Sequence, residues 1–284
     1  MYFCTDVWPG VAHRLTTNRC KVVDSPTQMH RLMTIISIVT FSAIGLLIFY
    51  LAVTGRGETS QPVDTSGYVV RGADISSHNG FVDFDMLRTH GIGFVYVKAT
   101  EGADFKDASF VANINAARKA GLKVGAYHFF RFDSSGYMQA LNLLHSVRGR
   151  HLDLPLVIDV EEWTNPVNRS TDQTVGRIKE MAEELRAEGY RVMLYTNKDG
   201  YSRFVEGRLD HYPLWICSFT PPDDGIDWTL WQYTHRGTLK GIDRLIDLNV
   251  YHGTREQWDS LTSVPRVVPP PVRLQYSGAS AVNH

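Results

Sequence analysis

The chain has 284 residues, of which 43% are hydrophobic and 21% are charged. This composition fits one large α/β domain with appendages and excludes a disordered protein. The formal net charge of −1 leaves no strongly basic domain, so no binding to nucleic acid is expected. The three cysteines, Cys4, Cys20 and Cys217, make neither a zinc spacing nor a disulfide framework, and Cys217 is expected to be a small buried apolar residue.

The first distinct element is residues 32–53, a stretch of 22 residues without a charge. As a helix it would span about 33 Å, enough for a hydrocarbon core of about 30 Å, so we predict a transmembrane signal anchor. A cleaved signal peptide is the alternative, but its apolar core is usually about 7 to 15 residues long. Basic residues are denser before the stretch than after it, which predicts a cytoplasmic tail over 1–31 and an exported remainder. Met29 or Met33 could be the true start.

Two further segments read as connections rather than folded structure. Residues 54–67 are rich in Gly, Ser, Thr and Pro and are predicted to be a linker. Residues 263–284 contain a proline cluster and are predicted to be an extended or disordered C-terminal tail. The folded domain is therefore expected over 68–262.

Within this domain, short apolar runs alternate with amphipathic segments. Strands are expected over 68–75, 93–99, 123–130, 154–161, 191–196, 213–218, 229–234 and 245–250. Helices are expected over 83–89, 108–120, 135–147 and 173–188. Such alternation predicts a parallel sheet and, with eight strands, a barrel. The helices become short or absent after the fifth strand, which indicates a less regular closure.

The fourth predicted strand, 154–161, is an apolar run that ends in Asp159 and Glu161. Residues two apart on a strand point to the same side, about 7 Å apart, so both acids are expected to face one cavity. Paired carboxylates in unequal environments can act as proton donor and charged partner in glycosidic bond cleavage. The alternative is a strand end that is acidic without being catalytic.

Other predicted strands also end in polar residues, and the C-terminal ends of barrel strands form the active site of this architecture. Each polar residue alone has a structural explanation, since Asp74 could cap a turn, Lys98 could pair internally and His128 could be a satisfied core histidine. The repetition of acids favours a site, and without an H-x-H or HExxH pattern a metal is not expected. About half of the nearby aromatic residues are expected to line the cleft rather than the core. The polar candidates are Asp74, Ser76, Ser77, His78, Asn79, Lys98, Thr100, Glu101, Tyr127, His128, Asp247 and Asn249, and the aromatic ones are Trp163, Trp215, Trp228, Trp231, Tyr195 and Tyr233.

Six motifs carry a resemblance to a known family. They are GADISSHNG at 72–80, FVYVKATEG at 94–102, GAYHF at 125–129, DVE at 159–161, LWQY at 230–233 and DLN at 247–249. In this order they resemble glycoside hydrolase family 25, the Chalaropsis-type lysozymes, over about residues 70–258.

The resemblance implies an N-acetylmuramidase on a modified TIM-type (βα)5β3 barrel, without a cofactor, that cuts the β-1,4 bond between N-acetylmuramic acid and N-acetylglucosamine in peptidoglycan. Glu161 inherits the role of general acid/base. Asp159 would orient the substrate's 2-acetamido group, the proposed internal nucleophile in a reaction with net retention. Asp74 and Asp247 match the two further acidic positions. The expected substrate-binding residues are Tyr127, Lys98, Glu101, Trp215, Trp231 and Asn249.

With the predicted anchor, the expected location is a bacterial cytoplasmic membrane, crossed once, with the N-terminus inside and the barrel in the periplasm or outside the cell. One departure from the family pattern is Phe219, where an L-W-x-A-x-Y segment often has tyrosine. It leaves open a weakly active or inactive peptidoglycan-binding scaffold on the same barrel. A third possibility is hydrolysis of another N-acetylhexosamine polymer such as chitin.

Overall fold

The computed structural model describes residues 63–166 and 168–263. The predicted tail at 1–31, the predicted anchor at 32–53, most of the linker and nearly all of the C-terminal tail lie outside the described residues. Among the described helices, none combines the length and the apolar character needed to cross a membrane. The anchor therefore remains a prediction from the sequence.

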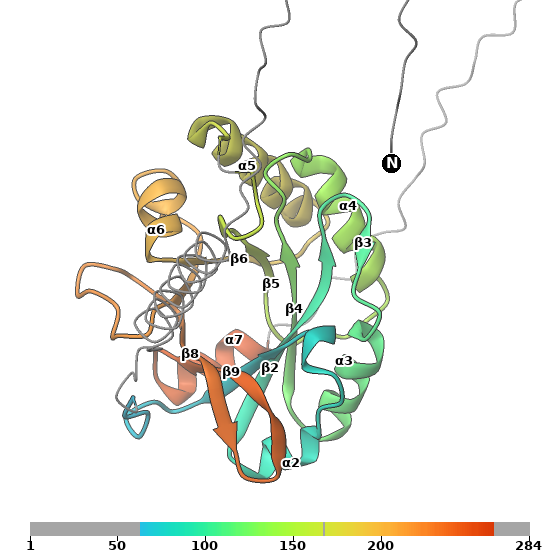
Figure 1. Ribbon diagram of the computed structural model, residues 1–284, viewed down its shortest axis with the longest axis vertical. Coiled ribbons are helices and arrows are strands. Elements are labelled where there is room, and N and C mark those ends of the chain that lie inside the picture. The colour runs from blue at the N-terminus through green and yellow to red at the C-terminus, as the bar shows by residue number, and fades with distance from the viewer. Residues whose placement is uncertain (1–62, 167, 264–284) are drawn as a thin grey trace, which may run out of the picture. The chain divides into compact units, whose positions relative to one another are not determined.

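The described residues form a closed barrel of eight strands (Figure 1). The barrel closes because β1 pairs with β2 on one side and with β9 on the other. A two-residue strand, β3 (Phe105–Lys106), adds a small hairpin to β2. The barrel strands are β1 (Arg71–Ile75), β2 (Ile92–Glu101), β4 (Lys123–Phe129), β5 (Leu156–Asp159), β6 (Val192–Asn197), β7 (Leu214–Cys217), β8 (Leu230–Leu239) and β9 (Ile242–Tyr251).

Helices follow the first five barrel strands and cover the outside of the barrel (Figure 1). Asp83, Ser135 and Ser170 cap the helices that follow them, because each side chain accepts a hydrogen bond from a backbone N–H of the first turn. The helical elements are η1 (Ser77–Asn79), α2 (Phe84–Thr89), α3 (Phe110–Lys119), α4 (Gly136–Val147), α5 (Thr171–Ala187), α6 (Lys198–Gly200), the π-helical turn η2 (Tyr201–Val205) and α7 (Arg255–Ser263). The eight predicted strands and four predicted helices are all present, with ends shifted by a few residues.

The direction of β9 differs from the parallel sheet that the alternation predicted. Apart from the short β2–β3 hairpin, all neighbouring strands from β1 through β8 are parallel, but β9 runs antiparallel to both β8 and β1. Only Lys240 and Gly241 separate β8 from β9, and Gly241 has a φ of +85°. A connection this short makes a hairpin, because a parallel crossover needs a dozen or more residues. The helical elements η1, α6, η2 and α7 were not predicted either.

Alternation along the strands separates two apolar layers. One layer, which includes Val95, Val97 and Ile158, packs under the helices. The other fills the barrel interior with Phe94, Tyr96, Val157, Met193, Tyr195 and Trp215. This interior is tight, since a Cβ at Gly125 would lie 2.2 Å from the Tyr96 ring. The aromatic side chains of the barrel interior lie beneath the polar residues at the strand ends.

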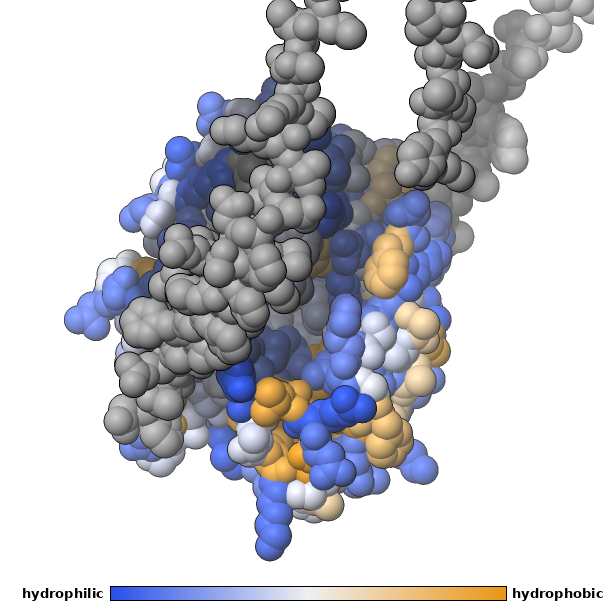
Figure 2. Space-filling model, in the orientation of Figure 1, coloured by the Kyte–Doolittle hydropathy of each residue, from blue (hydrophilic) through white to orange (hydrophobic). Residues whose placement is uncertain are grey.

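The visible outer surface of the described residues is mostly hydrophilic, with apolar side chains gathered near α2 and the β8–β9 hairpin and along the side that carries α3 and α4 (Figure 2). Phe81 and Trp163 are the most exposed of the large apolar side chains, at 89% and 75%. Trp163 belongs to the loop that follows β5, which is next to the candidate site.

Candidate active site

A cavity of about 370 Å³ lies where the parallel strands end. Its walls come from all parts of the barrel, so residues far apart in sequence meet there. The lining residues are Asp74, Ser76, His78, Asn79, Lys98, Tyr127, Phe129, Asp159, Glu161, Trp163, Tyr195, Trp215, Gln232, His235, Leu245 and Asp247.

Asp159 and Glu161 both line this cavity, as their spacing predicted. Asp159 is the last residue of β5 and is 6% exposed. The strand-like course continues past it, because the Val160 N–H donates to the Tyr195 carbonyl at 2.8 Å and the Thr196 hydroxyl donates to the Val160 carbonyl at 2.7 Å. Val160 therefore points outward into the core, and Glu161 returns to the cavity side.

Asp74 and Asp247 form a second acidic pair opposite each other on β1 and β9. Asp247 does not stand at the C-terminal end of a strand as expected; it lies within β9, and the antiparallel register brings it beside Asp74. Asp74 Oδ2 accepts hydrogen bonds from Asn249 Nδ2 at 2.8 Å and Gln232 Nε2 at 2.9 Å. Gln232 Nε2 also lies 3.2 Å from Asp247 Oδ2.

Burial of these four acids raises the pKa of each carboxyl. The pKa of Glu161 rises to about 7, through burial and then through the negative charge of Asp74. The pKa of Asp247 rises to about 8, through burial and Asp74, to which the protonated Asp247 donates a hydrogen bond. For Asp159, burial and the charge of Glu161 hold the pKa well above its ordinary value, and the Lys98 ammonium opposes them. The cluster thus retains protons near neutral pH.

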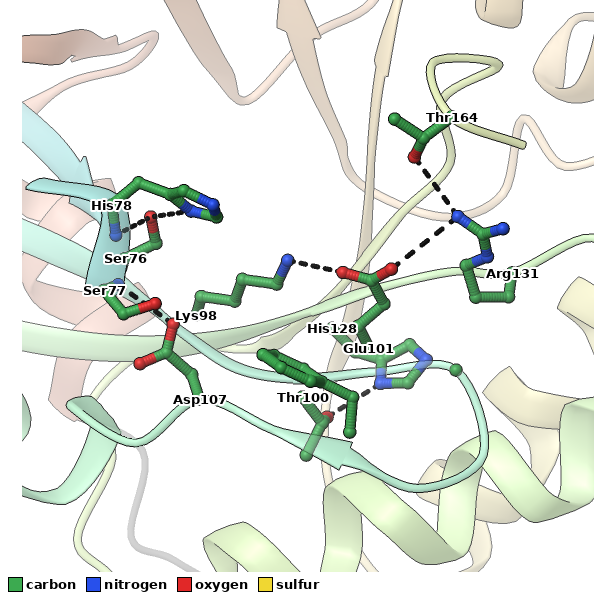
Figure 3. Close-up of polar contacts among 12 residues, drawn as sticks. Ser76, Ser77, His78, Lys98, Thr100, Glu101, Asp107, His128, Arg131 and Thr164 are labelled. Carbon is green, nitrogen blue, oxygen red and sulfur yellow. Dashed lines mark hydrogen bonds and ion pairs between the residues drawn. The ribbon is translucent and has the colours of Figure 1, made fainter.

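Lys98 enters the cavity from β2 and belongs to a chain of ion pairs (Figure 3). Its Nζ lies 2.8 Å from Glu101 Oε2, and Glu101 Oε1 lies 3.6 Å from Arg131 Nη1. The ammonium also sits over the rings of Phe105 and Phe129, at 5.6 and 5.1 Å from their centroids. Glu101, predicted to bind substrate, does not line the cavity and instead holds Lys98 and Arg131.

His128 does not reach the cavity. It is fully buried, and its ring nitrogens lie 2.7 Å from the Thr100 hydroxyl and 3.0 Å from Gln139 Oε1. Burial lowers its pKa to about 4. The alternative of a satisfied core histidine is therefore correct for this residue.

The aromatic residues divide between cleft and core. Tyr127, Trp163, Tyr195 and Trp215 line the cavity, whereas Trp228, Trp231 and Tyr233 do not. The Trp231 side chain packs on the opposite side of the sheet, 1% exposed, with its Nε1 donating to the Ser218 carbonyl at 2.7 Å. Trp231 is therefore a core residue, and from this position it does not reach the cavity in which it was predicted to contact substrate.

Asn249, also predicted to bind substrate, is fully buried behind the cavity, where it joins Asp74 to the indole N–H of Trp215. Four cavity residues were not predicted from the sequence, namely Phe129, Gln232, His235 and Leu245. Gln232 carried a signal, because a glutamine between two aromatic residues of a buried strand needs polar partners. It has three, since its Oε1 also accepts from the Tyr195 hydroxyl at 2.7 Å. No group of three or more His, Cys, Asp or Glu in the described ranges is arranged to hold a metal ion.

This geometry can be compared with known proteins. Residues 73–242 match the model of the glycosyl hydrolases family 25. The chain belongs to this family. It is therefore a glycoside hydrolase, and the resemblance seen in the six motifs is confirmed.

Relatives of this family 25 chain agree in sequence and in fold. It is 32% identical to the Escherichia coli (strain K12) protein YegX over 200 residues, covering 68% of this chain and 73% of YegX. It is 33% identical to lysozyme M1 of Streptomyces globisporus over 214 residues, covering 69% of this chain and 71% of that protein. A solved family 25 glycosyl hydrolase from Bacillus anthracis matches with a TM-score of 0.65 and 34% identity, covering 70% of this chain and 96% of that one.

Proposed function

We propose that this chain is a lysozyme, an N-acetylmuramidase that hydrolyses the β-1,4 bond between N-acetylmuramic acid and N-acetylglucosamine in peptidoglycan. Membership of family 25 and the similarity to a protein named lysozyme support this substrate. The observation that carries the proposal is the pair Asp159 and Glu161 in one cavity, with the Glu161 pKa raised to about 7.

Glu161 is the proton donor in this proposal. A glycosidic oxygen is a poor leaving group, so an acid must protonate it as the bond to the anomeric carbon breaks. A carboxyl with a pKa of about 7 keeps its proton over much of the range in which an ordinary glutamate is ionised. Burial of the Glu161 carboxyl therefore gives the acid that this step requires.

Asp159 is proposed to hold the 2-acetamido group of the substrate. Its Oδ1 is buried and has no hydrogen-bond partner among the described residues, so a donor from the substrate would satisfy it. The acetamido N–H is such a donor. Its hydrogen bond would stabilise the charged form of Asp159, which lowers the pKa of that carboxyl and leaves Glu161 as the protonated acid of the pair.

The acetamido oxygen would then attack the anomeric carbon while the glycosidic oxygen takes the Glu161 proton and leaves. Water opens the resulting oxazolinium ring and returns a proton to the Glu161 carboxylate, so the anomeric configuration is retained. Substrate-assisted enzymes of this kind are exceptions to the rule that predicts stereochemistry from carboxylate separation. Asp74, which accepts hydrogen bonds from Asn249, Gln232 and the protonated Asp247, supplies negative charge near the developing cation.

The proposal includes location. The charge-free stretch at 32–53 and the basic residues before it support a single-pass anchor in the bacterial cytoplasmic membrane, with the barrel in the periplasm or outside the cell. Fractionation of cells that make the full chain, followed by protease treatment of intact spheroplasts, tests this part. Recovery in the soluble fraction, or a barrel protected from added protease, would contradict it.

The activity is tested by digestion of purified peptidoglycan and mass spectrometry of the products. The wild type is expected to release fragments with reducing muramic-acid ends, and Glu161→Gln is expected to release none. Equal turnover by both proteins would remove Glu161 from its role. Binding of peptidoglycan without release of fragments would favour the scaffold alternative. Reducing N-acetylglucosamine ends, or cleavage of chitin, would show that the enzyme cuts a different bond or a different polymer.

A further inference from the structure

The loop that carries Glu161 contains an unusual backbone conformation. Thr164 has a φ of +60°, and it is the sole non-glycine residue with positive φ in the described ranges. A β-branched side chain rarely adopts this conformation, which costs free energy and persists only where surrounding contacts impose it. Such outliers concentrate at functional sites, so the contacts that impose this one are informative.

Asn165 supplies those contacts. Its side chain is 6% exposed and bonds to three backbone groups. The Oδ1 accepts from the Phe132 N–H at 2.9 Å, and the Nδ2 donates to the Phe130 carbonyl at 2.9 Å and to the Glu161 carbonyl at 2.8 Å. One amide therefore ties the main chain of Glu161 to the segment that follows β4.

Two arginines hold the same loop from either side. Arg131 Nη1 lies 3.2 Å from the Thr164 hydroxyl and also pairs with Glu101, as Figure 3 shows. Arg203, from the π-helical turn η2, pairs with Glu162 and bonds to the Arg169 carbonyl at 2.8 Å. Thr164 and Glu162, which lie between Glu161 and Asn165 in the chain, are thus held by arginines from different parts of the barrel. The hydrogen bond to the Glu161 carbonyl comes from Asn165.

We propose that Asn165 is a positioning residue that fixes the Glu161 carboxyl in the cavity by clamping the β5–α5 loop, in its left-handed turn at Thr164, to the end of β4. This inference rests on the proposed role of Glu161 as the acid. Asn165 does not line the cavity, so its effect on the reaction passes through the loop. If the loop holds the Glu161 carboxyl in one position, the burial of that carboxyl stays constant. Burial is the main cause of the raised Glu161 pKa.

The test measures the Glu161 carboxyl directly, by NMR titration of the full chain labelled with ¹³C at glutamate carboxyls and assigned by loss of the signal in Glu161→Gln. In Asn165→Ala the loosened loop admits water, so the Glu161 pKa is expected to fall by about one unit or more from the wild-type value. The kcat on peptidoglycan is expected to fall about tenfold or more, with KM changed less than about twofold.

The matched control is Asn113→Ala, since Asn113 is 8% exposed, bonds to the Ser109 hydroxyl at 3.1 Å and lies on α3 away from the cavity. It is expected to keep the wild-type Glu161 pKa and kcat. An unchanged pKa and kcat in Asn165→Ala, or equal changes in both variants, would overturn the proposal. If Asn165→Ala does not fold, Asn165→Ser decides, because the shorter hydroxyl side chain keeps a polar group at this buried position but cannot bond to Phe130, Phe132 and Glu161 at the same time. A lowered pKa in that variant supports the clamp, and a wild-type pKa overturns it.

The readouts also separate this inference from the proposed function. If the wild type releases no reducing ends but the Glu161 pKa falls in Asn165→Ala, the muramidase assignment fails and the clamp stands. If the wild type is active and the pKa is unmoved, the clamp fails alone.

Discussion

Asn249 Nδ2 lies 2.8 Å from Asp74 Oδ2, while Asn249 Oδ1 accepts the indole N–H of Trp215 at 2.8 Å. Asn249 is fully buried, so this single amide joins the aromatic filling of the barrel to the acidic cluster. Because both of its polar atoms are used, the orientation of Asp74 depends on a residue that does not touch the cavity.

Replacement of this amide is the first prediction. Asn249→Leu leaves the Trp215 N–H without a partner and removes one of the donors to Asp74, and an unsatisfied buried group costs about 1–3 kcal/mol. We expect the free energy of unfolding to fall by about 2–4 kcal/mol in urea titrations and kcat to fall with it. Asn113→Leu, which breaks one peripheral bond, is expected to lose less than half of that stability and to retain kcat. Equal losses in the two variants would contradict the bridging role.

The pH dependence of activity follows from the Glu161 pKa of about 7. The acid must be protonated to donate, so we expect kcat/KM to fall about tenfold per pH unit above that value. Reducing-end release measured from pH 5 to 9 at constant ionic strength checks this, with circular dichroism confirming that the protein stays folded. A profile that stays flat to pH 9 would assign the proton donor to another group.

Asp247 predicts a pH dependence of stability. Its pKa is raised from 3.8 to about 8, so the folded state binds this proton more tightly than the unfolded chain. The stabilisation is fully present below about pH 4 and is lost as the pH rises through about 8. Asp247→Asn removes this loss, so its stability relative to the wild type is expected to increase by about 2 kcal/mol or more between pH 5 and 9, since one pKa unit equals about 1.4 kcal/mol.

Urea unfolding of both proteins across that range tests this prediction. The buried His128, whose pKa is lowered to about 4, acts in the opposite sense as the pH falls below about 6.5, but it is common to both proteins and cancels in the comparison. A stability difference that does not vary with pH would show that Asp247 is ionised in the folded protein.

The alternation of apolar and polar residues along single strands was enough to predict the strands and the side to which their side chains point. The apolar run before Asp159 and the two-residue spacing to Glu161 placed both acids in one cavity, because strand alternation leaves no other arrangement. The direction of β9 was not predicted, although the Lys240–Gly241 connection is short enough to require a hairpin. The prediction assumed that the last strand is parallel to its neighbours like the earlier ones, whereas β9 is antiparallel to both.

The roles of individual side chains were harder to predict, because they depend on which partner occupies each position. Glu101 and Lys98 both end β2, and only the structure shows that Glu101 stands behind Lys98 and pairs with Arg131. Asn165 follows the acidic motif by four residues and carries no local signal, since its three partners come from the ends of two strands. Nonlocal hydrogen bonds of this kind cannot be read from spacing along one segment.

Lys98 is predicted to tune the Asp159 carboxyl. Its ammonium opposes the rise in the Asp159 pKa, so Lys98→Met is expected to raise that pKa further and to lower kcat about tenfold, with KM changed less. Lys123→Met is the control, because it also removes a lysine that pairs with a carboxylate, Asp153 at 3.3 Å, but outside the cavity; the Lys123 side chain is partly exposed and Asp153 keeps its other partners, so little stability should be lost. Equal loss of kcat in both variants would point to a general effect of charge removal and would contradict the specific effect of Lys98 on Asp159.

The two tryptophans Trp163 and Trp231 provide the sharpest test of which aromatic residues meet the substrate. Trp163 lines the cavity and is 75% exposed, so its removal costs little packing and takes away an apolar face on which a sugar ring can stack. We expect Trp163→Ala to raise KM about tenfold or less, with kcat and the free energy of unfolding nearly unchanged.

Trp231→Ala should behave in the opposite way. Its side chain is 1% exposed and packs against Tyr68, Trp228 and Tyr233, so truncation is expected to cost about 3–5 kcal/mol of stability. The fraction that remains folded in Trp231→Ala, measured by urea titration and used to normalise the rate, is expected to show the wild-type KM. A raised KM in the folded fraction of Trp231→Ala, together with a wild-type KM in Trp163→Ala, would reverse the assignment of the two residues and return Trp231 to the substrate-binding set.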